Sequence, residues 1–141
     1  PTRHRAVIFD LDGVVTDTAS VHRGAWRILF DEALARRPPA PGENHGAFTD
    51  DDYRRYVDGK PRYDGVADFL ASRGITLPWG QPTDPEDAET VCGLGNRKNR
   101  YFEQRLAADG VVVFDTTVDL VRRLRRSGIR VAVISASRAL Q

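Results

Sequence analysis

The chain has 141 residues, a length that suits one domain or one small core carrying an insertion. Hydrophobic residues make up 40% and charged residues 29%, which is typical of soluble globular proteins, and the net charge of +1 gives no reason to expect nucleic acid. No apolar stretch reaches the length of about 18 residues that a membrane span needs. The single cysteine, Cys92, excludes an internal disulfide, and without a visible signal peptide it predicts a cytoplasmic protein.

The first predicted element is a strand over residues 6–10, with the sequence Ala-Val-Ile-Phe-Asp. Its apolar run indicates a strand buried on both faces of a parallel sheet. Asp10 and Asp12 then lie at its carboxyl end, where open α/β sheets bind ligands, and Gly13 allows a sharp turn there. One carboxylate can attack a substrate or hold a metal while the other moves a proton. The alternative is a strand end that merely reaches solvent.

More than a hundred residues separate this strand from the next apolar strand, which is far more than an ordinary crossover. The excess predicts a helical cap domain over residues 19–105, inserted into a core of residues 1–18 and 106–141. Within the cap we expect helices over 19–36, from Thr49, over 64–73 and over about 85–106. Gly74 stands where the third of these should end, and residues 78–87 form a loop rich in proline, glycine and acids.

The chain closes with a predicted helix over about 116–127 and a strand over 129–134, joined at Gly128. The arginines of 122–126 are expected on a solvated helix face. Small hydroxyl residues follow the strand in the run Ser135-Ala136-Ser137-Arg138, which could bind an oxyanion or simply cap a helix. Two aliphatic strands argue for a Rossmann-like α/β core. Because two strands make an implausibly small sheet, the visible chain is expected to lack the C-terminal half of that core.

These motifs resemble those of the haloacid dehalogenase superfamily of phosphotransferases, in its β-phosphoglucomutase-like subgroup. The segment from Asp10 to Asp17 resembles the first motif of the superfamily, and Ser135 after an aliphatic strand resembles the second. The likeness to the subgroup rests on residues 17–26, 58–64, 97–99 and 135–138. Within the subgroup, the chain is similar to actinobacterial hydrolases linked to trehalose or maltose metabolism.

The resemblance implies a role for each residue at the strand ends. Asp10 is the implied nucleophile, which takes up the phosphoryl group as an aspartyl phosphate. Asp12 is the implied general acid and base. Mg²⁺ is expected as the cofactor, held by the Asp10 carboxylate and the Asp12 backbone carbonyl. Ser135 and the backbone at Ala136 are expected to hydrogen-bond the phosphoryl group.

A second phosphate, at the far end of the sugar, is expected to meet Arg62 from the cap, because a guanidinium binds phosphate through two hydrogen bonds. Gly59 precedes Arg62 in the Gly-Lys-Pro-Arg segment that carries the likeness. Ser137 and Arg138 are expected to approach the same phosphate from the core. Taken alone, Arg62 is better explained as a surface charge, whereas its place in the Gly-Lys-Pro-Arg segment favours the phosphate-binding role.

Four further residues of the cap region have weaker assignments. His22 is expected to link cap closure to the Asp12 region, or to be an ordinary half-buried helix histidine. Lys98 is expected to face the substrate, or to be a solvated lysine. Thr18 is expected at the hinge, or as the N-cap of the first cap helix. Trp26 is expected to pack that helix.

The resemblance therefore implies an enzyme that isomerises a hexose phosphate, most simply β-glucose 1-phosphate to glucose 6-phosphate. The alternatives are a sugar-phosphate phosphatase and a non-catalytic module of a larger sugar enzyme. The implied partner is a small phosphorylated sugar, with a fused or associated glycoside-processing enzyme, and neither nucleic acid nor a membrane is expected. The lysine of the third family motif and the acid pair of the fourth do not occur in these residues, so the chain alone is expected to turn over negligibly.

Overall fold

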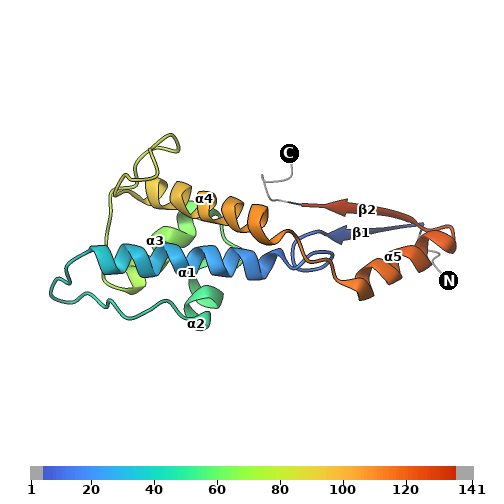
Figure 1. The fold of residues 1–141 in the computed structure, drawn as a ribbon, viewed down its shortest axis with the longest axis horizontal. Helices are drawn as coiled ribbons and strands as arrows, with labels where there is room; N and C mark the ends of the chain where they lie inside the picture. The colour runs from blue at the N-terminus through green and yellow to red at the C-terminus, as the bar shows by residue number, and fades with distance from the viewer. Residues whose placement is uncertain (1–4, 136–141) are drawn as a thin grey trace. The chain divides into compact units, whose positions relative to one another are not determined.

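The structure is a computed structural model that describes residues 5–135; residues 1–4 and 136–141 lie outside the described part. Contacts divide the chain into two compact units, one of Pro1–Val21 with Leu106–Gln141 and the other of His22–Arg105. The elements labelled in Figure 1 are β1 (Ala6–Asp10), α1 (Thr18–Arg36), α2 (Asp50–Asp52), α3 (Arg62–Ser72), α4 (Val91–Asp109), α5 (Asp115–Arg126) and β2 (Arg130–Ile134), and a π-helical turn, η1 (Tyr53–Val57), follows α2.

The first unit contains a parallel sheet of β1 and β2, which lie side by side in Figure 1. The register pairs Ala6 with Arg130 and Asp10 with Ile134, so both strands end at the same edge. Helix α5 precedes β2 and contacts it, and Gly128 between them has a φ of 76°. This confirms the predicted parallel α/β arrangement, and the arginines of residues 122–126 are exposed as expected.

The expectation that these strands are buried on both faces is wrong for the described residues. Ile8 is 65% exposed and Ile134 is 59% exposed, and half-buried and exposed positions alternate along β1. The physical reason is that, within residues 5–135, each strand has one strand neighbour and α5 is the helix with the most contact to the sheet. The apolar run therefore predicted the strand and its partner correctly, but it overestimated how far the strand is buried.

The second unit is a helical cap built around a cluster of aromatic and aliphatic side chains. Phe30 of α1 and Phe69 of α3 lie at its centre with ring centroids 4.0 Å apart, and both are fully buried. Trp26 is 4% exposed and belongs to the same cluster, which confirms its predicted packing role. Helix α4 approaches α3 closely because Gly95 has no side chain: a Cβ there would lie 2.6 Å from the Tyr63 ring. No helix within residues 5–135 is both long and apolar enough to cross a membrane.

Helix α4 begins at Val91, later than the predicted start near residue 85. Thr90 determines this start, because its hydroxyl accepts a hydrogen bond from the Gly93 amide at 3.0 Å and donates one to the Asp84 carboxylate at 2.6 Å. The acids and prolines before Thr90 therefore form a folded loop instead of a first helical turn. Thr49, in contrast, caps α2 as predicted, in a reciprocal capping box with Asp52.

A buried arginine, Arg73, fixes the loop that precedes α2. Its guanidinium donates to the Gly46 carbonyl, to the Ala47 carbonyl at 3.2 Å and to the Asp52 carboxylate at 2.9 Å. The same group lies 4.8 Å from the centre of the Phe69 ring. Because Arg73 is only 6% exposed, the carbonyl and carboxylate oxygens replace the water that its charge would otherwise need.

Replacing this arginine should destabilise the cap strongly. We expect Arg73→Met to lower the free energy of unfolding by about 3–5 kcal/mol, because it leaves Asp52 and the loop carbonyls without their donor. Arg54→Met is the matched control, since Arg54 is an exposed arginine 3.6 Å from Asp51, and it should cost about 0–1 kcal/mol. Denaturant unfolding followed by circular dichroism measures both, and equal losses would contradict the assignment.

A second cluster of hydrogen bonds, half-buried, surrounds Glu43. Its carboxylate accepts from the His45 ring at 2.7 Å, the Ala40 amide at 3.2 Å and the Arg37 guanidinium at 3.2 Å. These three donors, the histidine first, lower the pKa of Glu43 from 4.5 to about 2. The carboxylate therefore stays charged well below the pH at which an unfolded chain would protonate it.

Glu43 should make stability depend on acid. Between its ordinary pKa of 4.5 and about 2, the unfolded chain binds a proton that the folded chain does not, so its contribution is complete above pH 4.5 and lost as the pH falls to about 2. Glu43→Gln should lower the melting temperature near neutral pH and flatten its decline on acidification. Thermal melts across this pH range test the prediction, with a variant of an exposed glutamate, Glu103→Gln, as control. If the melting temperature of Glu43→Gln declines with acid as steeply as that of the wild-type protein, the assignment is refuted.

Candidate active site

The turn after β1 is held in place by its own backbone and by a segment that is distant in the sequence. The Leu11 amide donates to the Ile134 carbonyl at 2.8 Å and thus extends the pairing of the two strands. The Gly13 amide donates to the Thr16 carbonyl at 2.7 Å, and Gly13 has a φ of 80°, which favours glycine. Asp17 donates its amide to the Val112 carbonyl at 2.8 Å. The acids after β1 therefore lie on a fixed loop.

Asp12 and Ser135 meet at the carboxyl ends of the paired strands. The Ser135 hydroxyl donates to Asp12 Oδ2 at 2.9 Å. Asp10, the last residue of β1, is exposed and stands in register with Ile134, the residue before Ser135. The structure thus brings together the two acids and the hydroxyl that the sequence singled out, at the sheet edge where α/β proteins bind ligands.

Thr18 has a contact that the sequence did not reveal. Its hydroxyl donates to Asp12 Oδ1 at 2.6 Å, and the residue is only 5% exposed. Together with Ser135 it fixes both carboxylate oxygens of Asp12. Thr18 is not the N-cap of α1, because Asp17 accepts the Ser20 amide at 3.3 Å and performs that role. A threonine six residues after an acid carries no recognised signal, so only the folded turn shows this positioning role.

The cap places Lys98 and His22 in contact. Lys98 Nζ lies 2.8 Å from His22 Nδ1, and the His22 ring stacks on Phe102 with centroids 4.0 Å apart. The ammonium also lies over the Trp26 ring at 4.9 Å and over the Phe102 ring at 5.0 Å. Lys98 is 5% exposed, so the reading of it as a solvated lysine is wrong. His22 is half-buried, which agrees with the alternative that it is an ordinary helix histidine.

Burial and a neighbouring cation make Lys98 titrate at an unusual pH. Removal from water, and then the positive charge of Arg62, lower the pKa of Lys98 from 10.5 to about 7. Near neutral pH this amine is therefore only partly protonated. An anion that reached Arg62 and Lys98 would be stabilised by both cations and would favour the charged amine.

Arg62 and Gly59 lie in the turn that leads into α3. Arg62 is the first residue of the helix, and its guanidinium lies 5.2 Å from the Tyr63 ring centre. Gly59 has a φ of 69°, and a Cβ added there would have no neighbour within 4 Å. The glycine therefore serves the turn itself, and its predicted contact with substrate stays a prediction. Ala136, Ser137 and Arg138 lie outside the described residues, so their phosphate-binding roles also stay predictions.

Oxygen ligands of the kind that Mg²⁺ prefers are present at the strand ends. Asp10 offers an exposed carboxylate, and Asp12, two residues further along the chain, offers a backbone carbonyl. Within residues 5–135 no group of three or more His, Cys, Asp or Glu side chains could hold a metal ion. This donor set fits Mg²⁺, which commonly binds one or two carboxylates and completes its shell with water and substrate phosphate.

The family of haloacid dehalogenase-like hydrolases matches residues 4–140. The chain belongs to this family. The predicted resemblance is thereby confirmed at the level of the family, and so is the α/β core with an inserted helical segment.

Individual relatives narrow the likeness. The chain is 50% identical to the β-phosphoglucomutase of Mycobacterium bovis over 138 residues, which are 97% of this chain and 53% of that protein. It is 48% identical over 135 residues to an uncharacterized glycosyl hydrolase of Mycobacterium tuberculosis, of which it covers 10%. The crystal structure of an archaeal β-phosphoglucomutase from Pyrococcus has a TM-score of 0.67 at 28% identity, over 94% of this chain and 53% of that one. The chain thus spans about half the length of its β-phosphoglucomutase relatives.

The proximity of Arg62 to Lys98 can be tested by titration. We expect Arg62→Gln to raise the pKa of Lys98 above 7 and leave it below 10.5, because the repulsion disappears while burial remains. The lowered pKa also predicts that stability rises between pH 7 and 10.5, where the unfolded chain binds the extra proton. The chemical shift of the carbon next to the Lys98 amine, followed by NMR as the pH is changed, reports this pKa directly. Arg54→Gln is the control. If the pKa of Lys98 does not change in the Arg62→Gln variant, the two side chains do not interact.

Proposed function

We propose that this chain carries the nucleophile and the cap of an Mg²⁺-dependent enzyme that isomerises a hexose phosphate, converting β-glucose 1-phosphate to glucose 6-phosphate. The observation that carries the proposal is the edge at which β1 and β2 end, where Asp12 is fixed by Thr18 and Ser135 beside Asp10. The likeness to β-phosphoglucomutases supports the reaction class.

The reaction runs in two transfers on Asp10. Asp10 carries a phosphoryl group when β-glucose 1-phosphate binds; another hydroxyl of the sugar attacks that phosphorus as its bond to the Asp10 oxygen breaks, and Asp12 takes the proton of this hydroxyl, which gives a sugar with two phosphates. The Asp10 carboxylate then takes the phosphoryl group from the original position as the bond to that sugar oxygen breaks, and Asp12 gives its proton to this leaving oxygen. Asp10 and the Asp12 carbonyl would hold Mg²⁺, whose charge would offset the negative charge of the transferring phosphoryl group.

The hydroxyls around Asp12 would keep it in the geometry that proton transfer needs. Thr18 and Ser135 each hold one of its two oxygens, so the carboxyl plane is fixed before substrate arrives. Ser135 directly follows Ile134, which is in register with Asp10, so its hydroxyl could instead donate a hydrogen bond to a phosphoryl oxygen on Asp10. Thr18 is a positioning residue in this scheme, because it acts through Asp12.

In the cap, Arg62 and Lys98 supply the second phosphate site. Arg62 is a cation and lowers the pKa of Lys98 to about 7, so a phosphate that bound here would offset the Arg62 charge and favour the protonated Lys98 amine. His22 contacts Lys98 and would respond to the protonation of the Lys98 amine when the anion binds. Ser137 and Arg138 are proposed to meet the same phosphate from the core. Thr18, at the start of α1, is the proposed hinge.

Two other functions have some support. A phosphatase, in which water accepts the phosphoryl group from Asp10, is favoured by the hydrolase family to which the chain belongs. A module of a larger sugar enzyme is favoured by the glycosyl hydrolase of which this sequence matches only a tenth. A reducing cytoplasm suits all three, since the one cysteine, Cys92, is buried and forms no disulfide.

Activity measurements on the full-length protein separate these functions. Asp10→Asn should lower phosphoryl transfer by about a thousandfold or more, because it removes the nucleophile. Arg62→Ala should abolish isomerisation of β-glucose 1-phosphate while hydrolysis of p-nitrophenyl phosphate, which has no second phosphate to bind, persists. Asp119→Asn is the control, an exposed acid of α5 paired with Arg122.

Each alternative has its own outcome in the same assay. Isomerisation that survives Arg62→Ala removes this residue from the second phosphate site. Hydrolysis without isomerisation in the wild-type protein favours the phosphatase. If the full-length protein transfers no phosphoryl group at all, the non-catalytic module is the correct function.

A further inference from the structure

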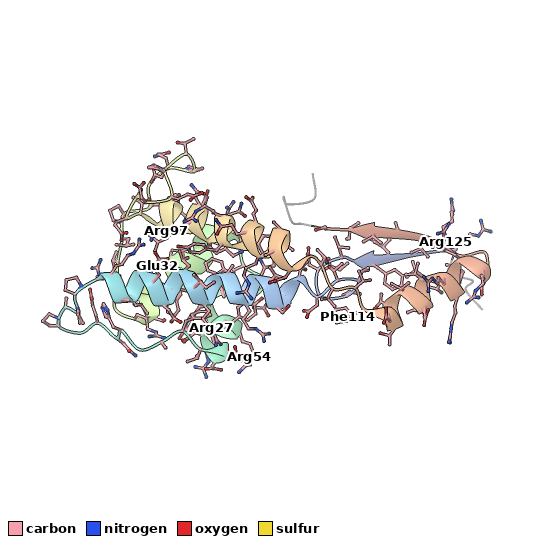
Figure 2. The ribbon with its side chains drawn as sticks, viewed as in Figure 1. Arg27, Glu32, Arg54, Arg97, Phe114 and Arg125 are labelled. Atoms are coloured by element: carbon pink, nitrogen blue, oxygen red, sulfur yellow. The ribbon has the colours of Figure 1, made fainter. Side chains whose placement is uncertain are left out.

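A cavity of about 470 Å³ lies in the cap, between the second half of α1, the loop before α4 and α4 itself. Glu32 and Arg36 line it from α1, Glu86 and Asp87 from the loop, and Arg97 and Arg100 from α4. Figure 2 labels Arg97 and Glu32 on the two facing helices. The proposed function uses none of these residues.

Arg97 is a buried cation in the lining of this cavity, and its hydrogen bonds are incomplete. It is 3% exposed; its Nε donates to the Glu86 carbonyl at 2.6 Å, and one terminal nitrogen reaches the exposed Glu89 carboxylate only at 3.5 Å. Its other terminal nitrogen is buried and has no hydrogen-bond partner among the described residues. Because an unpaired buried donor is costly, an acceptor from a ligand that reached this nitrogen would be favoured.

The other charges of the lining are already paired, with one exception. Glu32 accepts from Arg36 and from the Tyr101 hydroxyl, and Glu86 accepts from Arg100. Asp87 is exposed and forms no ion pair with any residue of the described range 5–135. The cavity therefore offers a ligand one donor group at Arg97 and one acceptor group at Asp87.

We propose that this cavity binds a neutral polyhydroxylated ligand, such as a sugar. A hydroxyl group both accepts and donates, so neighbouring hydroxyls can accept from Arg97 and donate to Asp87. A phosphate would meet three carboxylates, of Glu32, Glu86 and Asp87, whose repulsion offsets the attraction of Arg97. The balance of three lining carboxylates against three guanidinium groups favours a ligand without net charge.

This site is separate from the proposed phosphate site on the same helix. Arg97 and Lys98 are consecutive in α4, and consecutive residues of a helix point about 100° apart. Lys98 contacts His22 and Trp26, whereas Arg97 faces Glu86 and the cavity. A ligand in the cavity would therefore bind without touching Lys98.

The test is a titration of the full chain with D-glucose, followed by amide chemical shifts, with inorganic phosphate and acetate as comparison ligands. We expect saturable shifts at residues 86–87 and 97–101. Arg97→Gln should weaken glucose binding by about tenfold, since it removes the charged donor. Arg27→Gln is the control: this exposed arginine of α1 pairs with Asp50 and does not line the cavity.

Asp87→Ala provides an independent variant, because an exposed side chain can be removed without disturbing the cap core, and it should also weaken glucose binding. The proposal then remains testable if Arg97→Gln does not fold. Shifts that do not saturate, shifts elsewhere, or glucose binding unchanged by Asp87→Ala would overturn it. Tighter binding of phosphate or acetate than of glucose at these residues would also overturn it, and would identify an anion site instead.

Discussion

The parallel pairing of β1 with β2 is the contact on which the candidate active site depends. Asp12 and Ser135 are 123 positions apart in the chain, and only this pairing places the serine hydroxyl 2.9 Å from the carboxylate. The Leu11 amide continues the pairing beyond β1 and fixes where the turn begins. Without it, the two acids and the hydroxyl would be unrelated polar groups at the ends of separate segments.

Local signals in the sequence predicted most elements, because each rests on a few adjacent residues. Thr49 and Asp52 cap α2, and Gly74 and Gly128 adopt the positive φ angles expected after α3 and α5. The start of α4 was wrong because Thr90 competes with the earlier acids as a cap, and which of them succeeds depends on the contact with Asp84. Such competition cannot be read from composition or periodicity.

Contacts between distant residues were the part that sequence could not supply. The polarity of Lys98 predicts exposure, yet Trp26 of α1 covers it. The lowered pKa of Lys98 follows from that burial. Thr18 likewise contacts Asp12 only because the turn between them folds back. The family resemblance marked Lys98 and Asp12 as important positions, whereas the physical reason for each lies in a neighbour that the motif does not include.

The long separation of β1 from β2 also affects how the chain can fold. Closing a flexible loop of about 120 residues costs about 4 kcal/mol in chain entropy beyond the constant term, before the strands gain any pairing energy. The cap, with its helices and its own aromatic core, lies entirely within that loop and can form from contacts closer in sequence. Once the cap has formed, the flexible part of the loop between the two strands is much shorter. The inserted domain is therefore expected to fold first, and the sheet that carries the two acids to assemble last.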